Sequence, residues 1–239
     1  MSIPSYSGQT YVAYLDISGF KEMMKNEKKA RSVLDRFYGT IYDIPYETPA
    51  LDSPLAIRMN AVAVSDCAVL FLSSGSEESC RDVDKIEGLP KLLEFIKKTN
   101  RALVKKSFGF PFMTTCSIAY GNFEYRNKSD REYVRKNCIM GTAYVRALLD
   151  SESNESKMRP GECRILKANL ELLPSQNRIF HLLESRKTYY YFYWMLENPQ
   201  DIRRFKRKYR KIWEGTYSRL IELLQNSASR TDIQNDGGF

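Results

Sequence analysis

Two aspartates, Asp16 and Asp66, stand where a carboxylate is costly to bury. Asp16 follows the apolar run TYVAYL, which predicts a buried strand over 10–17, and Asp66 separates two apolar runs that predict a hairpin over 57–74. If the strand lies beside the hairpin, both acids meet at one edge of a sheet. Two adjacent carboxylates repel each other unless one is protonated or cations bridge them. Such a pair suits Mg²⁺ or Mn²⁺, which also take phosphate oxygens as ligands.

The segment Ile17–Ser18–Gly19–Phe20 joins this strand to a helix predicted over 20–37. A glycine-containing turn that enters a helix presents backbone N–H groups to an anion such as a triphosphate. Acid, turn and second acid together favour two-metal phosphoryl chemistry. The competing interpretation is a pair of solvated turn aspartates.

The elements that must position these residues follow in the order strand, helix, two strands, helix, two strands, helix. Apolar spacing predicts a long amphipathic helix up to Val104, a strand over 112–121 and a strand-to-helix segment through Gly141, with loops at 43–55, 74–84 and 151–161. This order predicts an α+β fold, a mainly antiparallel sheet packed with helices. We expect a catalytic domain over 1–170 and a mainly helical extension over 171–239 packed on the same domain.

Composition excludes several classes of function. The chain has no apolar run long enough to cross a membrane and no signal-peptide pattern at its start, so we expect a cytoplasmic protein without a membrane partner. Its five cysteines contain no C-x-x-C pair and read as reduced thiols. With His181 as the only histidine, multi-histidine metal sites and histidine-dependent triads are excluded.

The net charge of +8 favours polyanionic partners without identifying one. Basic and aromatic residues alternate over 203–211, a pattern that can bind nucleic acid. The apolar members nevertheless keep a helical period, which favours a core-facing helix with solvated lysines and arginines. We therefore expect no nucleic-acid partner. A basic RNA- or DNA-binding protein stays as a hypothesis that ranks third, after the two given at the end of this section.

The chain resembles the class III nucleotidyl cyclase domain, which has a ferredoxin-like core, in four segments that follow in order over about residues 10–150. "LDISGF" resembles the D-I-x-G-F motif that opens that domain, and "AVSDCAVLF" is similar to its second metal-aspartate hairpin. "CSIAYG" is similar to its next strand, and "MGTAYVRALLDSE" to the strand-to-helix segment that completes the site. The form of this last motif, with Tyr144, and the compact helical tail look most like the bacterial pyrimidine cyclases of Pycsar anti-phage systems.

The resemblance implies roles for individual residues. Asp16 and Asp66 would hold two divalent cations, Mg²⁺ or Mn²⁺, with the Ile17 carbonyl as a further ligand. Backbone at Ser18, Gly19 and Phe20 would bind the triphosphate, with Tyr144 at the nucleotide. Each site would lie across a head-to-tail homodimer, with the aspartates from one chain and the Gly141 helix from the other.

The last motif departs from the purine cyclases. Those enzymes read G-x-x-V-N-x-A-A-R, whose asparagine contacts the ribose and whose arginine contacts the transition-state phosphate. Val145 and Leu149 occupy these two places and can do neither. Arg146 is the nearest basic substitute for the catalytic arginine, and a solvated helix residue is the alternative.

The positions that read the purine base also differ. They hold Val62 and Cys138, so the lysine-and-aspartate code for adenine is missing. Arg58 and Asn60, on the strand that leads to Asp66, are candidate readers of a pyrimidine, with exposed strand residues as the alternative.

The resemblance therefore implies an enzyme that converts UTP or CTP to its 3′,5′-cyclic monophosphate and pyrophosphate. Its product would be a second messenger for a separate effector in anti-phage defence. A cyclase-like regulatory module that binds nucleotide without turnover is the alternative.

Overall fold

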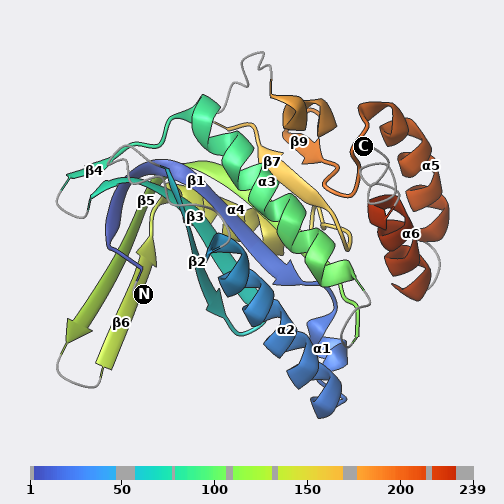
Figure 1. Cartoon of the computed structure of the whole chain (residues 1–239), viewed down its shortest axis with the longest axis horizontal. Coiled ribbons are helices and arrows are strands. Elements are labelled where there is room, and N and C mark those ends of the chain that lie inside the picture. The colour runs from blue at the N-terminus through green and yellow to red at the C-terminus, as the bar shows by residue number, and fades with distance from the viewer. Residues whose placement is uncertain are drawn as a thin grey trace, which may run out of the picture.

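Nine strands form one sheet in the part of the chain that the computed structural model describes, which is residues 3–46, 57–76, 79–105, 110–130, 134–168, 177–213 and 217–229 (Figure 1). The strands are β1 (Tyr6–Ile17), β2 (Arg58–Val64), β3 (Cys67–Ser76), β4 (Ser79–Arg81), β5 (Thr114–Asp130), β6 (Val134–Met140), β7 (Cys163–Leu166), β8 (Leu183–Ser185) and β9 (Tyr189–Phe192). Their order is β2-β3-β1-β5-β7-β9-β8, with β4 beside β3 and β6 beside β5.

All of these strand pairs are antiparallel except β5–β7, which is parallel. The helices are α1 (Phe20–Met23), α2 (Glu27–Tyr46), α3 (Lys85–Val104), α4 (Thr142–Glu152), α5 (Ile202–Trp213) and α6 (Tyr217–Ser229), with short 3-10 turns η1 (Arg178–Leu182) and η2 (Pro199–Asp201). A mainly antiparallel sheet packed with helices confirms the predicted α+β class. No helix in the described part of the chain is both long and apolar enough to span a membrane.

β1 is buried along most of its length because helices cover both faces of the sheet. Tyr11 points to one face, where its hydroxyl donates to the Lys85 carbonyl of α3 at 2.9 Å, and α2 lies beside α3 across that face (Figure 1). Tyr14, three residues on, points to the opposite face. Its neighbour Ser117 of β5 donates to Asp150 of α4 there, at 2.5 Å. We call these the α3 face and the α4 face.

The predicted helix over 20–37 is two helices. Asn26 separates them because its side chain accepts the Lys29 N–H at 3.1 Å, the contact of an N-cap, and α2 starts at Glu27. α2 then continues to Tyr46, so the start of the predicted 43–55 loop is helical, and residues 47–56 lie outside the described part.

Other predicted boundaries also moved. The 74–84 segment, predicted as a loop, contains β4, which pairs with the end of β3. The strand predicted over 112–121 continues as β5 to Asp130, because its second half pairs with β6.

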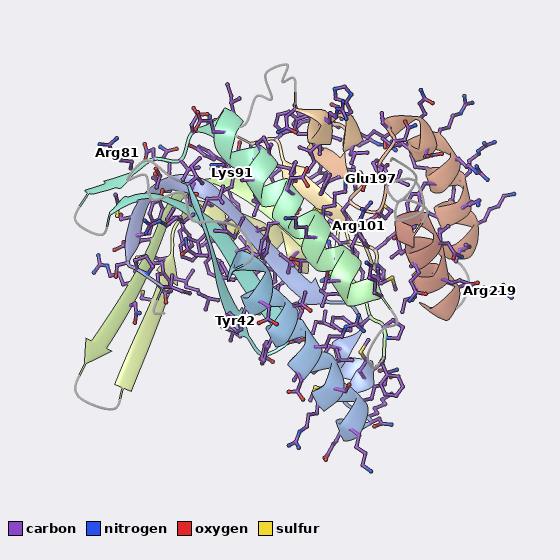
Figure 2. The ribbon with its side chains drawn as sticks, in the orientation of Figure 1. Tyr42, Arg81, Lys91, Arg101, Glu197 and Arg219 are labelled. Carbon is purple, nitrogen blue, oxygen red and sulfur yellow. The ribbon has the colours of Figure 1, made fainter. Side chains whose placement is uncertain are left out.

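The C-terminal third is joined to the same sheet and to α3. β9 pairs with β7, so the sheet itself continues past residue 170. Figure 2 shows Glu197 and Arg101 approaching each other from the segment after β9 and from α3, and they form an ion pair. In α5, Phe205 and Tyr209 are buried while most of the lysines and arginines between them are exposed, as the helical period predicted. The division at residue 170 remains a prediction.

Candidate active site

Asp16 and Asp66 come together at the end of β1. Asp16 is the penultimate residue of β1 and pairs with Cys67, the residue after Asp66. The Ile17 N–H donates to the Asp66 carbonyl oxygen at 3.0 Å. The hairpin turn is tight at Ser65, whose φ of 55° lies in the left-handed region. Acids separated by 50 residues of sequence therefore lie side by side at one end of the sheet, Asp16 on β1 and Asp66 in the β2–β3 turn, as predicted.

The electrostatics of Asp16 favour a cation. Burial, then the Asp66 charge, then the Glu152 charge raise the pKa of Asp16 from 3.8 to about 6. The ionised carboxylate is therefore held at a free-energy cost that a bound cation would remove. In the described residues, no cluster of three or more His, Cys, Asp or Glu side chains is placed to hold a metal. Two carboxylates with solvent beside them fit Mg²⁺ or Mn²⁺, which keep water and phosphate oxygens as their remaining ligands.

The turn after β1 offers fewer donors than predicted. The Ser18 N–H donates to the Met113 carbonyl at 2.9 Å, so this donor is engaged within the protein. Gly19 is exposed, adopts φ 76°, and has open space where a Cβ would lie. The Phe20 ring is buried, so only its backbone faces the turn. The anion-binding prediction therefore narrows to the N–H groups of Gly19 and Phe20.

α4 lies against the same sheet edge. It begins after Gly141, where φ is 120° and a Cβ would meet the Asn122 carbonyl oxygen at 2.3 Å. Only glycine allows this close crossing of β5. Tyr144 and Glu152, eight residues apart, share one side of the helix. Burial, then the Cys67 and Glu152 charges, raise the pKa of Tyr144, which places this phenol near the strand partner of Asp16.

Arg146 lies on another side of α4. It is two residues from Tyr144, about 200° around the helix, so it does not point to the aspartates of its own chain. Its Nη1 is buried and has no hydrogen-bond partner among the described residues. Val145 and Leu149, at the places of the purine-cyclase asparagine and arginine, are 46% and 61% exposed.

The candidate base readers lie farther along the sheet. Arg58 and Asn60 are on the same face as Asp16, since they pair with Ser73 and Phe71 of β3. The Val64–Cys67 pair lies beside Asp16. At the rise of a strand, Arg58 is six residues and about 20 Å from this pair, and Asn60 is four residues and about 13 Å from it. Arg58 is exposed, whereas the buried Asn60 amide donates to Ser73 Oγ at 2.9 Å.

Sequence reasoning missed two charged features of this region. Glu152 is the second carboxylate, after Asp66, whose charge acts on Asp16, and its signal in the sequence was its spacing from Tyr144. The second is a buried ion pair: Arg164 of β7, 2% exposed, donates to both Asp150 carboxylate oxygens at 2.8 and 2.9 Å. This pair fixes α4 to the sheet. From the sequence alone, both residues would be taken for solvated charges.

Comparison with solved structures identifies the fold. The guanylyl cyclase Cya2 superposes with a TM-score of 0.53 at 13% identity, covering 80% of this chain and 93% of that one. The dimeric guanylyl cyclase domain of the RhoGC fusion protein from the aquatic fungus Blastocladiella emersonii superposes with a TM-score of 0.54 at 12% identity, covering 80% and 98%. This chain has the class III nucleotidyl cyclase fold. No protein-family model matches the sequence, and no curated protein matches it.

These superpositions confirm the class III cyclase fold that the sequence motifs implied. At these identities they establish the architecture alone, so the pyrimidine substrate and the residue roles remain proposals.

Proposed function

We propose that this protein is a pyrimidine nucleotide cyclase that converts UTP or CTP to the 3′,5′-cyclic monophosphate and pyrophosphate. The observation that carries the proposal is the proximity of Asp16 to Asp66, whose carbonyl accepts the N–H of Ile17 next to Asp16, on the fold of nucleotidyl cyclases. Two carboxylates held close together repel each other, and a bound cation would remove this repulsion.

Each part of the site has a role in this reaction. Asp16, Asp66 and the Ile17 carbonyl would hold two cations, Mg²⁺ or Mn²⁺, which would supply activation of the attacking oxygen and neutralisation of the leaving phosphate. The N–H groups of Gly19 and Phe20 donate to triphosphate oxygens. The ribose 3′-hydroxyl gives its proton to water and its oxygen bonds to the α-phosphorus, while the bond from that phosphorus to the oxygen of the leaving pyrophosphate breaks. Tyr144, Arg58 and Asn60 are proposed nucleotide contacts.

The proposed preference for a pyrimidine rests on the two residues that stand where purine cyclases have the lysine and aspartate that recognise adenine. Val62 is buried and has no hydrogen-bonding side chain, so it cannot read adenine as a lysine does. Cys138 replaces the aspartate. We propose that the product is a second messenger of the Pycsar kind that acts on a separate effector in anti-phage defence.

We further propose a homodimer with its active sites at the interface. Val145 and Leu149 expose apolar side chains on α4, and Val64 exposes another at the β2–β3 hairpin. Apolar groups gathered near a functional edge favour a protein contact. Arg146, whose Nη1 lacks a partner among the described residues, is then the proposed arginine for the partner chain's transition state.

The direct test is incubation with Mn²⁺ and each of the four ribonucleoside triphosphates, with products read by mass spectrometry. We expect a cyclic monophosphate from UTP or CTP alone. Product from ATP or GTP would retain the cyclase proposal and discard the pyrimidine one.

Matched variants test the metal pair. Asp66→Asn should lower turnover by more than the roughly 100-fold that loss of a residue supporting a metal ligand causes, with an unchanged circular dichroism spectrum. Asp35→Asn, at an exposed position of α2, is the control. Near-normal turnover in Asp66→Asn would exclude a two-metal site.

A regulatory module that binds nucleotide without turnover is the second candidate. Val145 and Leu149 favour it, because neither can stabilise charge in a transition state. Saturable UTP or CTP binding with Mn²⁺, without product, would support this candidate.

A further inference from the structure

A groove of about 860 Å³ lies between β7, β9 and α5, outside the candidate active site. None of the residues that line it belongs to the acid pair, the glycine turn or α4. Its volume falls in the range of small-molecule sites, about 300–1,000 Å³. The groove therefore has room for a ligand that the cyclase reaction does not use.

Tyrosine rings form one wall of the groove. Tyr189 and Tyr191 alternate along β9 and so point to one face, and Tyr193, the residue after the strand, also lines the groove. Tyr189 and Tyr191 meet edge to face with ring centroids 6.2 Å apart, and Tyr193 meets Phe205 of α5 in the same way at 6.2 Å. Because these contacts fix the rings before any ligand arrives, the wall is a preorganised stacking surface.

Positive charge surrounds the rings. Five cations line the groove: Arg159, Arg186, Lys187, Lys206 and Arg210. Glu184 holds two of them, Lys206 at 2.5 Å and Arg186 at 3.4 Å. With the lining acid Glu162 counted as well, the cations still exceed the acids by three. This excess favours an anionic ligand.

Glu162 adds an acceptor to the groove. Its carboxylate accepts the backbone N–H of Arg159 at 2.8 Å, beside the phenols of Tyr193 and Tyr209. Burial raises the pKa of Glu162, because shielding from water disfavours the charged carboxylate. An acceptor among aromatic rings is placed to bind an N–H group on a planar ligand.

We propose that this groove is a second binding site, for a nucleoside phosphate. The base stacks on the tyrosine wall, an N–H group of the base donates to Glu162, and Lys187 and Arg210 pair with the phosphate. A planar ring joined to an anion is the ligand chemistry that uses all three features. The site would sense a nucleotide independently of the acid pair.

Calorimetric titration with 5′-AMP, 5′-UMP and inorganic phosphate, in EDTA, tests the proposal on the full chain. EDTA removes the cations that nucleotide binding at the acid pair would need, and the Asp66→Asn variant should give the same result. We expect saturable binding of at least one nucleotide, about tenfold or more tighter than inorganic phosphate. A failed cyclase assay would leave this measurement unaffected.

Two matched pairs of variants locate the binding. Arg210→Ala should weaken it about tenfold or more, whereas Arg207→Ala, an exposed residue of α5 outside the lining, should not. Tyr191→Leu should weaken it, whereas Tyr190→Leu, on the opposite face of β9, should not.

Three results would overturn the proposal. They are equal effects within each pair of variants, inorganic phosphate binding as tightly as the nucleotides, and no heat from any of the three ligands at millimolar concentration. If a single-stranded oligonucleotide binds while the mononucleotides do not, the surface is a nucleic-acid track and the proposal is also wrong.

Discussion

Replacing Asp16 by asparagine should stabilise the metal-free protein. In the folded chain, burial and the Asp66 charge raise the Asp16 pKa from 3.8 to about 6. At about 1.4 kcal/mol per pH unit between these values, the ionised carboxylate costs about 3 kcal/mol of folding free energy. Screening by water at its exposed part leaves about 2 kcal/mol. Asparagine keeps the shape of the side chain and removes the charge.

The sign of the pH dependence follows from the same shift. Below about pH 4 Asp16 is protonated in both the folded and the unfolded chain, so ionisation costs nothing. Between about pH 4 and 6 the unfolded chain loses the proton first, and the wild type loses stability relative to Asp16→Asn. Well above pH 6, where the folded carboxyl has also lost its proton, the difference is complete.

Urea unfolding in EDTA at pH 4 and pH 8 measures this difference. With a slope of about 3 kcal/mol per molar urea, the midpoint of Asp16→Asn should exceed that of the wild type by about 0.7 M at pH 8, and by much less at pH 4. Mn²⁺ should raise the wild-type midpoint and leave the variant unchanged. Asp35→Asn serves as the control at an exposed carboxylate. A variant no more stable than the wild type at pH 8 would refute the electrostatic reasoning.

Three further changes test how the site is supported, each by urea unfolding. Asp150→Asn leaves the Arg164 guanidinium buried with one partner carboxylate lost and should cost about 3–5 kcal/mol, whereas Asp150→Leu combined with Arg164→Met should recover most of the loss. Asp84→Ala removes an N-cap that accepts two backbone N–H groups of α3 and should cost about 1 kcal/mol; no loss would exclude the cap. Gly141→Ala forces its Cβ against the Asn122 carbonyl and should abolish turnover together with a fall in the midpoint. Wild-type stability in that variant would contradict the close crossing.

The acid pair could be predicted from sequence because its signals are local. A strand that ends in Asp16 and a hairpin that turns at Asp66 are short patterns, and only one further inference, that strand and hairpin are neighbours, was needed to join them. The division of the helix after Phe20 was missed because an apolar period continues across the cap at Asn26. A side-chain cap of this kind can separate two helices while the spacing of the apolar residues stays helical.

Features set by tertiary contacts had no such signal. Whether the Ser18 N–H is available depends on Met113, which the fold brings to it from the start of another strand. Asp150 and Arg164 become a buried pair only because α4 packs on β5, the strand beside β7. In both cases the deciding partner is distant in sequence, so periodicity carries no information about it.

The exposed apolar side chains of α4 have a consequence for how the protein would signal in a cell. Val145 and Leu149 leave about half of their surface exposed, and if they form the proposed dimer contact, the active site exists only when two chains meet. At chain concentrations below the dimer dissociation constant, output would rise with the square of the chain concentration. A tenfold rise in expression would then give about a hundredfold rise in cyclic nucleotide, so the amount of protein alone would set a threshold for the response.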